Sequence, residues 1–158
     1  MKWVEVIENP VLRDLPFKVE LNEWGNIVMS PASNQHGYLQ SELASFLRQH
    51  KKHGKVITEC SVDTPRGVKV ADVAWGSDEF IKNNGLETPY VQAPEVCVEI
   101  VSPSNSEGEV KEKISLYLSK GAAEVWICEE NGHVRFYGYK GEMTSSRFFP
   151  DAPVMIEM

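Results

Sequence analysis

The sequence predicts an α/β protein of the α+β kind, with a central mixed β-sheet flanked by two main helices and an N-terminal β-hairpin. Three observations predict this fold. The run Val96–Val101 is short, almost wholly apolar and bounded by Pro94 and Pro103, which is typical of a strand buried on both faces. Two segments, 35–53 and 106–121, place apolar residues at helical spacing. Strand-like runs surround them, so the expected order is ββ-α-βββ-α-ββ, with the helices covering one sheet.

The hairpin is expected close to the N-terminus. Residues up to about 20, which include Pro10 and Pro16, otherwise form an irregular lead-in. The turn at Gly25-Asn26 predicts a hairpin that pairs 18–21 with 27–29.

The first main helix and two strands follow the hairpin. The helix runs from about Gln35 to His53, and Gly54 ends it. Its apolar stripe consists of Leu39, Leu43, Phe46 and Leu47. Strands are expected near 55–63 and 68–75, and an irregular stretch is expected at 76–93.

The second main helix leads into a C-terminal hairpin. A capping box at Ser106–Glu109 begins the helix, and Gly121 ends it. Strands at 124–128 and 133–139 are joined by a turn at Gly132.

Size and composition indicate one domain that spans 1–158. The apolar content of 42% suffices for a core, and the net charge of −7 argues against broad, sequence-blind nucleic-acid binding while leaving room for a local basic groove. The cysteines lack CxxC spacing and are expected to be free thiols in a reducing compartment; they are Cys60, Cys97 and Cys128. No secretory leader or membrane-length apolar segment is evident, so a soluble cytoplasmic protein is expected.

Glu99 lies inside the apolar run Val96–Val101. Burying a carboxylate there costs several kcal/mol unless a metal ion or a lysine pairs with it. Asp72 lies in the strand-like stretch 68–75. Two inward acids on neighbouring strands, followed by a lysine-bearing helix, indicate a metal-dependent site. Because two buried acids repel each other, Asp72→Asn is expected to leave the metal-free protein as stable or more stable.

Lys113 is the lysine expected at this site, because it lies at i+3 from Val110, beside the apolar face of its helix. Two carboxylates can hold Mg²⁺ through oxygen ligands. The metal acidifies a water molecule and stabilises the charge that grows on a phosphodiester, while a lysine orients the water or neutralises the phosphate.

Several motifs together resemble those of a known family. They are Met29-Ser30-Pro31 with His36-Gly37, Val70–Ala74, Pro94–Ser104, Lys113–Tyr117 with Gly121, and Glu124–Ile127. This string resembles the PD-(D/E)XK nuclease superfamily, and more specifically its Uma-type family of putative restriction endonucleases. The resemblance implies a restriction-endonuclease-like core, a Mg²⁺ or Mn²⁺ cofactor, and Asp72, Glu99 and Lys113 as catalytic residues.

The chain departs from the superfamily pattern at two positions. Ala71 replaces the proline of the "PD" pair, and Val101 stands where a lysine is expected, so the resemblance assigns the lysine role to Lys113. It also implies that the backbone carbonyl of Ile100 joins the metal shell. Some members add an acid from the first helix. Glu42 is the one candidate here, and it lies a short way round the helix from the apolar stripe.

Each candidate also has a structural explanation. Glu99 could pair with a buried arginine, Asp72 could end a strand, and Lys113 could extend from the core edge into solvent. A basic cluster that includes Lys51, Lys52 and Lys55 could touch phosphates or could be a solvated helix end.

Three functions therefore compete. The first is a metal-dependent DNA endonuclease, for which superfamily precedent favours a homodimer. The second is an inactive nuclease-fold module that binds nucleic acid or protein. The third, a two-carboxylate glycosidase, ranks last because the four tryptophans are scattered rather than gathered in a cleft.

Overall fold

The computed structural model describes residues 1–13, 15 and 17–158. Its elements, in chain order, are α1 (Trp3–Glu8), β1 (Phe17–Leu21), β2 (Ile27–Pro31), α2 (Asn34–His50), β3 (Lys55–Thr64), β4 (Gly67–Gly76), α3 (Asp78–Asn84), β5 (Val96–Val101), α4 (Glu107–Ser119), β6 (Glu124–Glu129), β7 (Val134–Gly138) and β8 (Gly141–Met143).

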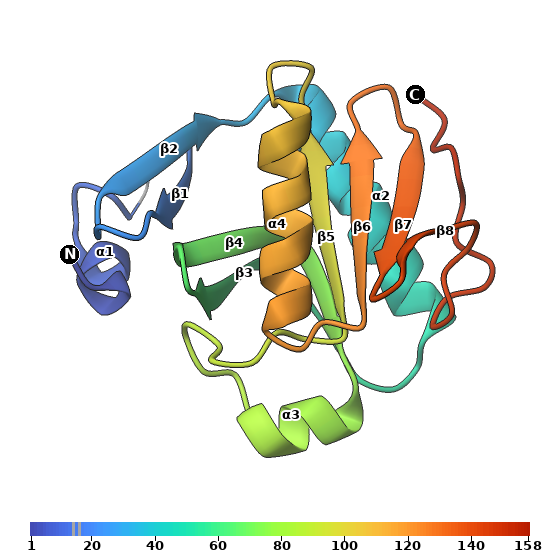
Figure 1. Ribbon diagram of the computed structural model, residues 1–158, viewed down its shortest axis with the longest axis horizontal. Coiled ribbons are helices and arrows are strands. Elements are labelled where there is room, and N and C mark those ends of the chain that lie inside the picture. Colours follow the sequence, from blue (N-terminus) through green and yellow to red (C-terminus); the bar gives the residue numbers. More distant parts are fainter. Residues whose placement is uncertain (14, 16) are drawn as a thin grey trace.

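The central sheet has the strand order β3-β4-β5-β6-β7-β8 and is mixed. β5 and β6 are parallel, and α4 makes the crossover between them, whereas the other neighbouring strands are antiparallel. β5 lies between β4 and β6, which confirms the prediction of an interior strand. α4 crosses one face of the sheet and α2 lies behind the other (Figure 1).

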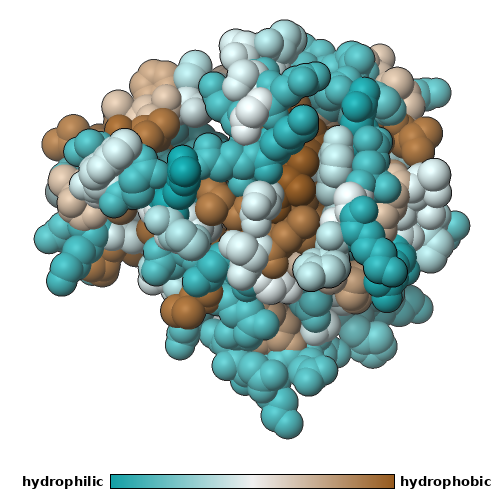
Figure 2. Space-filling view, viewed as in Figure 1, coloured by the Kyte–Doolittle hydropathy of each residue, from teal (hydrophilic) through white to brown (hydrophobic). Residues whose placement is uncertain are grey.

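Each face of the sheet has its own apolar layer. α2 contributes Leu39, Leu43 and Leu47, which pack with Trp126 and other side chains of the sheet. On the opposite face Tyr117 of α4 packs in a second cluster. The face seen in Figure 2 is mostly hydrophilic, with a narrow hydrophobic strip over the region of α4 and β6. Because an apolar layer packs against each face of the sheet, β5 is apolar on both sides.

The N-terminal hairpin, β1 with β2, forms a separate two-stranded sheet beside the central one (Figure 1). A third apolar cluster, which includes Leu21 and Val70, joins it to β4. Gly67, in the turn between β3 and β4, has a φ of +91°. A side chain there would collide with the backbone oxygens of Leu21 and Asn22, so glycine allows the end of β1 to lie directly against this turn.

The structure corrects two expectations of irregular chain. The lead-in contains α1, in which Trp3 and Val6 are buried, and the stretch 76–93 contains α3. α3 begins where Ser77 Oγ accepts a hydrogen bond from the backbone N–H of Phe80. Both helices span two turns or fewer, too short for apolar periodicity to appear.

Smaller differences concern element ends. α2 ends at His50 rather than His53, because Lys51 has an extended backbone. Ser106 caps α4 through the N–H of Glu109, but the Glu109 side chain accepts from Asn105 instead of completing a capping box. The expectation for Pro16 lies outside the described residues. No helix in the described ranges is long and apolar enough to span a bilayer. The three cysteines are free and buried.

Candidate active site

Asp72 and Glu99 lie on neighbouring strands and point to one place. Val73 of β4 pairs with Val98 of β5, and continuing this register sets Asp72 opposite Glu99. Their relative exposures are 0% and 2%. Asp72 Oδ2 accepts a hydrogen bond of 2.8 Å from the backbone N–H of Ile100, which fixes its carboxylate against β5. The predicted convergence of the two acids is therefore present.

Lys18, from β1, lies between the two carboxylates. Its Nζ is 2.9 Å from Glu99 Oε2 and 3.3 Å from Asp72 Oδ1. Burial alone would lower the pKa of Lys18, but the carboxylates of Glu99, Asp72 and Glu20 outweigh burial and raise this pKa. Lys18 is therefore a cation, and it offsets the repulsion between the two acids.

Lys113 reaches the same cluster from α4, as predicted. Its Nζ is 3.2 Å and 3.1 Å from the two carboxylate oxygens of Glu20, and 3.4 Å from Glu99 Oε1. Glu20 belongs to β1, is buried, and also accepts a 2.7 Å hydrogen bond from the N–H of Val70. Burial would raise the pKa of Glu20, but Lys113 and Lys18 lower it overall.

Tyr117 holds the second oxygen of Glu99. Its hydroxyl donates a 2.6 Å hydrogen bond to Glu99 Oε1. Burial raises the pKa of Tyr117 and the neighbouring Glu99 carboxylate raises it further, so the phenol keeps its proton. Burial also raises the pKa of Glu99, and the carboxylates of Asp72 and Glu20 add to this effect, while Lys113 and Lys18 oppose it.

Asp72 has the opposite electrostatic environment. Burial would raise its pKa, but contact with His36, the charge of Lys18 and the N–H of Ile100 together lower it to about 2. His36 Nε2, in the first turn of α2, is 3.3 Å from Asp72 Oδ1, and this contact raises the pKa of His36. The site thus separates the pKa values of its two acids, an arrangement found where neighbouring carboxyl groups have different roles.

The donor set fits a hard divalent cation. Among the described residues, Asp72 Oδ1 is buried with only the 3.3 Å ion-pair contacts to Lys18 and His36, and it faces the same point as Glu99 Oε2. Carboxylate oxygens are the ligands that Mg²⁺ prefers, usually with several waters. Within residues 1–13, 15 and 17–158, however, no three His, Cys, Asp or Glu side chains are already grouped to hold a metal. The side chains that meet at this point are therefore the two carboxylates of Asp72 and Glu99.

A cavity of about 870 Å³ opens beside this cluster. Its basic lining residues are Arg13, Lys18, His36, Lys69 and Lys113. Ser102, Ser104 and Asn105, which follow β5, add hydrogen-bonding groups to the wall. The wall carries charges of both signs, since its acidic residues are Glu20, Glu59, Glu99, Glu109, Glu112 and Glu130.

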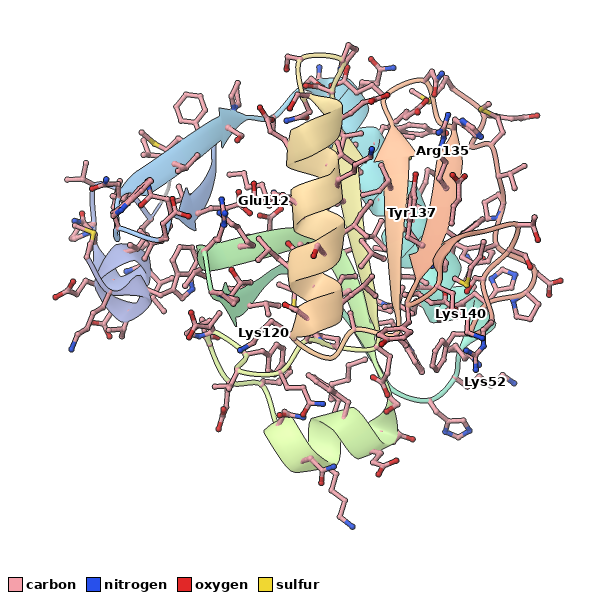
Figure 3. The ribbon with its side chains drawn as sticks, in the orientation of Figure 1. Lys52, Glu112, Lys120, Arg135, Tyr137 and Lys140 are labelled. Atoms are coloured by element: carbon pink, nitrogen blue, oxygen red, sulfur yellow. The ribbon has the colours of Figure 1, made fainter. Side chains whose placement is uncertain are left out.

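Four residues singled out in the sequence lie elsewhere. Glu42 is exposed on α2 and does not line the cavity, so the third acid of the cluster is Glu20 of the hairpin instead. Lys51, Lys52 and Lys55 follow the far end of α2, about 20 Å along the helix from His36. Lys51 Nζ lies 5.8 Å and 5.5 Å from the ring centroids of Trp75 and Phe149. In Figure 3, Lys52 is well separated from Glu112, which projects from α4 on the side of the hairpin.

Comparison with known proteins identifies the family. A family model described as "Putative restriction endonuclease", Uma2, matches residues 12–156. The chain belongs to the Uma2 family. The fold is similar to the crystal structure of a putative nuclease belonging to DUF820 from Anabaena variabilis ATCC 29413, with 22% sequence identity and a TM-score of 0.68. The similarity covers 87% of this chain and 80% of that one. No curated protein matches the chain.

Sequence reasoning missed two charged residues of this Uma2 site, Lys18 and Glu20. They alternate with Phe17, Val19 and Leu21, so in a strand they share one face. The charged face packs toward the site, whereas Phe17 is 42% exposed. The signal available in the sequence was a strand in which apolar residues alternate with a lysine and a glutamate, opposite a predicted acid cluster.

Tyr117 and His36 fit simple packing positions, but both also have polar contacts in the site. Tyr117 lies on the apolar face of α4 and is fully buried, yet its hydroxyl contacts Glu99. His36 lies at the edge of the core, and its ring nitrogen faces Asp72. Periodicity locates both residues correctly, but it does not reveal what their polar atoms contact.

Proposed function

We propose that this Uma2 protein is a divalent-metal-dependent DNA endonuclease that hydrolyses phosphodiester bonds with water. The observation that supports this most strongly is the meeting of Asp72 Oδ1 and Glu99 Oε2 at one cation position, beside a cavity whose wall carries both cationic and acidic side chains. Family membership supports the same reaction class. The cationic groups of the wall are the ones that would contact the phosphates of DNA.

Asp72 and Glu99 would hold Mg²⁺ or Mn²⁺, and the backbone carbonyl of Ile100 is a further proposed ligand. When bound, the cation supplies charge stabilisation at the phosphate and acidifies a water molecule. The chain contributes rigid positioning: Ile100 N–H holds Asp72, and Tyr117 holds Glu99. Lys113, which is partly exposed at the cavity, is proposed to orient the attacking water or neutralise the phosphodiester.

DNA is proposed to lie along the cavity. Arg13 and Lys69 are its cationic wall residues outside the acid cluster. Because the chain carries a net charge of −7, binding should be weak and should fall steeply with salt. A separate prediction is that DNA phosphates farther from the cavity contact Lys51, Lys52 and Lys55. A homodimer and a cytoplasmic location also stay predictions; sedimentation velocity would test the first.

The test is cleavage of supercoiled plasmid at low salt with Mg²⁺ or Mn²⁺, followed by addition of a chelator. We expect nicked or linear products with metal and none after chelation. Lys113→Ala should abolish cutting while sparing Mn²⁺ binding, because the lysine acts on water or phosphate. Lys111→Ala is the matched control, since Lys111 is exposed on the same helix. Purified, metal-loaded protein that neither binds nor cuts a varied DNA library would overturn the proposal.

One observation favours an alternative, an inactive nuclease-fold module that binds nucleic acid or protein. The ammonium of Lys18 already occupies the point between the two carboxylates, and a cluster with its own internal cation can be stable without catalysing anything. The two functions differ in Mn²⁺ affinity. An inactive module should bind Mn²⁺ weakly and equally before and after Asp72→Asn, whereas an enzyme should lose affinity on that change.

A further inference from the structure

We propose that Lys18 competes with the divalent cation for the Asp72–Glu99 pair, so that its ammonium must leave before one cation contacts both carboxylates. This inference rests on the proposed metal site. Lys18 lies on the hairpin, outside every motif noted in the sequence. It would control how tightly the site binds metal.

Both cations would use the same two oxygens. Lys18 Nζ lies 2.9 Å from Glu99 Oε2 and 3.3 Å from Asp72 Oδ1. A Mg²⁺ ion held at about 2.0–2.1 Å from both oxygens, on the side that Lys18 occupies, would overlap the ammonium. Two cations at such a separation would also repel strongly in a buried site, where the dielectric screening is weak.

Charge balance favours the exchange. Three buried carboxylates, those of Glu20, Asp72 and Glu99, face the two ammoniums of Lys18 and Lys113. With His36 neutral, the cluster therefore keeps one formal negative charge. A divalent cation in place of Lys18 removes that charge, whereas a monovalent one would not.

Lys18, rather than Lys113, is the ammonium that a cation shared by the two acids would displace. Lys113 contacts both oxygens of Glu20 at 3.1–3.2 Å and reaches only one oxygen of the acid pair, at 3.4 Å. Lys18 lines the cavity, and its flexible four-carbon stem can carry the ammonium into it without movement of β1. There it would lie where the substrate phosphates are proposed to pass.

The experiment measures Mn²⁺ binding directly, by electron paramagnetic resonance of the free ion, with no activity assay. Lys18→Met keeps the length of the side chain and removes its charge. Lys111→Met, on the exposed face of α4, is the matched control. We expect Lys18→Met to bind Mn²⁺ at least about tenfold more tightly than the unmodified protein, and Lys111→Met to change affinity less than about twofold. Adding Asp72→Asn to Lys18→Met should remove the gain, which assigns it to this site.

A measurement on the unmodified protein guards against a variant that fails to fold. The rate at which acetic anhydride modifies each lysine is followed by peptide mass spectrometry, with and without saturating Mg²⁺. The side chain of Lys18 is only 11% exposed, so its rate should be slow without metal and several-fold faster with it. The rate for Lys111 should not change.

The outcomes separate this inference from the endonuclease proposal. Equal or weaker Mn²⁺ binding by folded Lys18→Met, no binding by either protein, or an unchanged Lys18 modification rate in metal would each overturn the competition. If the unmodified protein cuts DNA with metal while Lys18→Met binds no more tightly, the competition fails and the endonuclease stands. If Lys18→Met binds more tightly and no variant cuts DNA, the competition stands and the endonuclease fails.

Discussion

Two buried acids in apolar strands of this protein have very different surroundings. Glu124, at the start of β6, is 1% exposed. Its carboxylate accepts hydrogen bonds from Trp126 Nε1 at 3.0 Å, Ser146 Oγ at 2.6 Å and the backbone N–H of Arg147 at 2.8 Å. All of these donors are neutral, and most come from the segment that follows β8. Glu124 therefore anchors the C-terminal part of the chain to the sheet.

Glu99, which lines the cavity, is equally buried but is held by cations. Lys18 and Lys113 reach it from two different elements, and Tyr117 is its one neutral donor. Its partner Asp72 is likewise held by ion-pair contacts to Lys18 and His36. The comparison shows that burial alone does not mark an acid as functional. Cationic partners, a second acid close by and an adjoining cavity distinguish the functional candidate from the structural one.

The largest expected effect comes from removing the functional candidate. Glu99→Ala should lower metal-dependent cleavage by about 100-fold or more and should abolish Mn²⁺ binding, because one of two carboxylate ligands is gone. Plasmid nicking rates and Mn²⁺ titrations measure the two effects. Full cleavage by this variant would place the chemistry elsewhere.

Removing the structural acid should have the complementary result. Glu124→Ala leaves buried donors unsatisfied and opens a cavity, so the free energy of unfolding should fall by about 3 kcal/mol. Mn²⁺ affinity of the folded fraction should not change. Urea denaturation measures the loss, with Glu142→Ala, an exposed change on β8, as the control. A Glu124→Ala protein of normal stability but weakened metal binding would reverse the comparison.

Asp72→Asn should destabilise the metal-free protein by about 2 kcal/mol, which reverses the expectation drawn from two repelling acids. The reason is Lys18, whose charge Asp72 pairs with. Because the folded pKa of Asp72 is about 2, below its ordinary value of 3.8, its contribution should be complete above about pH 4 and should be lost as the pH falls toward 2.

Denaturation of both proteins across this pH range would check the loss, with the exposed Asp63→Asn of β3 as the control. A difference between wild type and Asp72→Asn that stays constant down to pH 2 would contradict the pairing.

The smallest expected effect concerns His36. Its pKa should lie above the ordinary value of 6.5 because of its contact with Asp72, and burial opposes this rise. In Asp72→Asn the contact loses its charge, so the pKa should fall to or below 6.5. An NMR titration of the ring protons measures the change. A His36 pKa that does not respond to Asp72→Asn would remove this histidine from the cluster.

The sequence predicted that the side chains of Glu99 and Lys113 come together. The apolar run around Glu99 and the helical spacing of Lys113 follow from periods of two and 3.6 residues, and both residues meet where expected. Glu124 shows the limit of this reasoning. It begins a strand as apolar as the one holding Glu99, and only the folded positions of Trp126 and Ser146 reveal that its role is structural.

The rest depended on contacts between distant segments. Lys18 and Glu20 are 81 and 93 residues from the partners they bind, Glu99 and Lys113. The hairpin turns its charged face to the site, while Val19 and Leu21 on the other face of β1 pack in a separate apolar cluster. The helices α1 and α3 escaped prediction because they are short and depend on single buried aromatic residues, Trp3 and Phe80.

Gly67 has a consequence for how the site is built. The backbone of Leu21 and Asn22 lies where a side chain at position 67 would need to be, so this turn sets how far β1 can approach the sheet. Lys18 and Glu20 are on that same strand. A methyl group at Gly67 would push β1 away from the sheet. Lys18 and Glu20 would then both move away from Asp72, Glu99 and Lys113, although the methyl group would touch none of these residues. A residue without a side chain thus sets the position of the whole charge network.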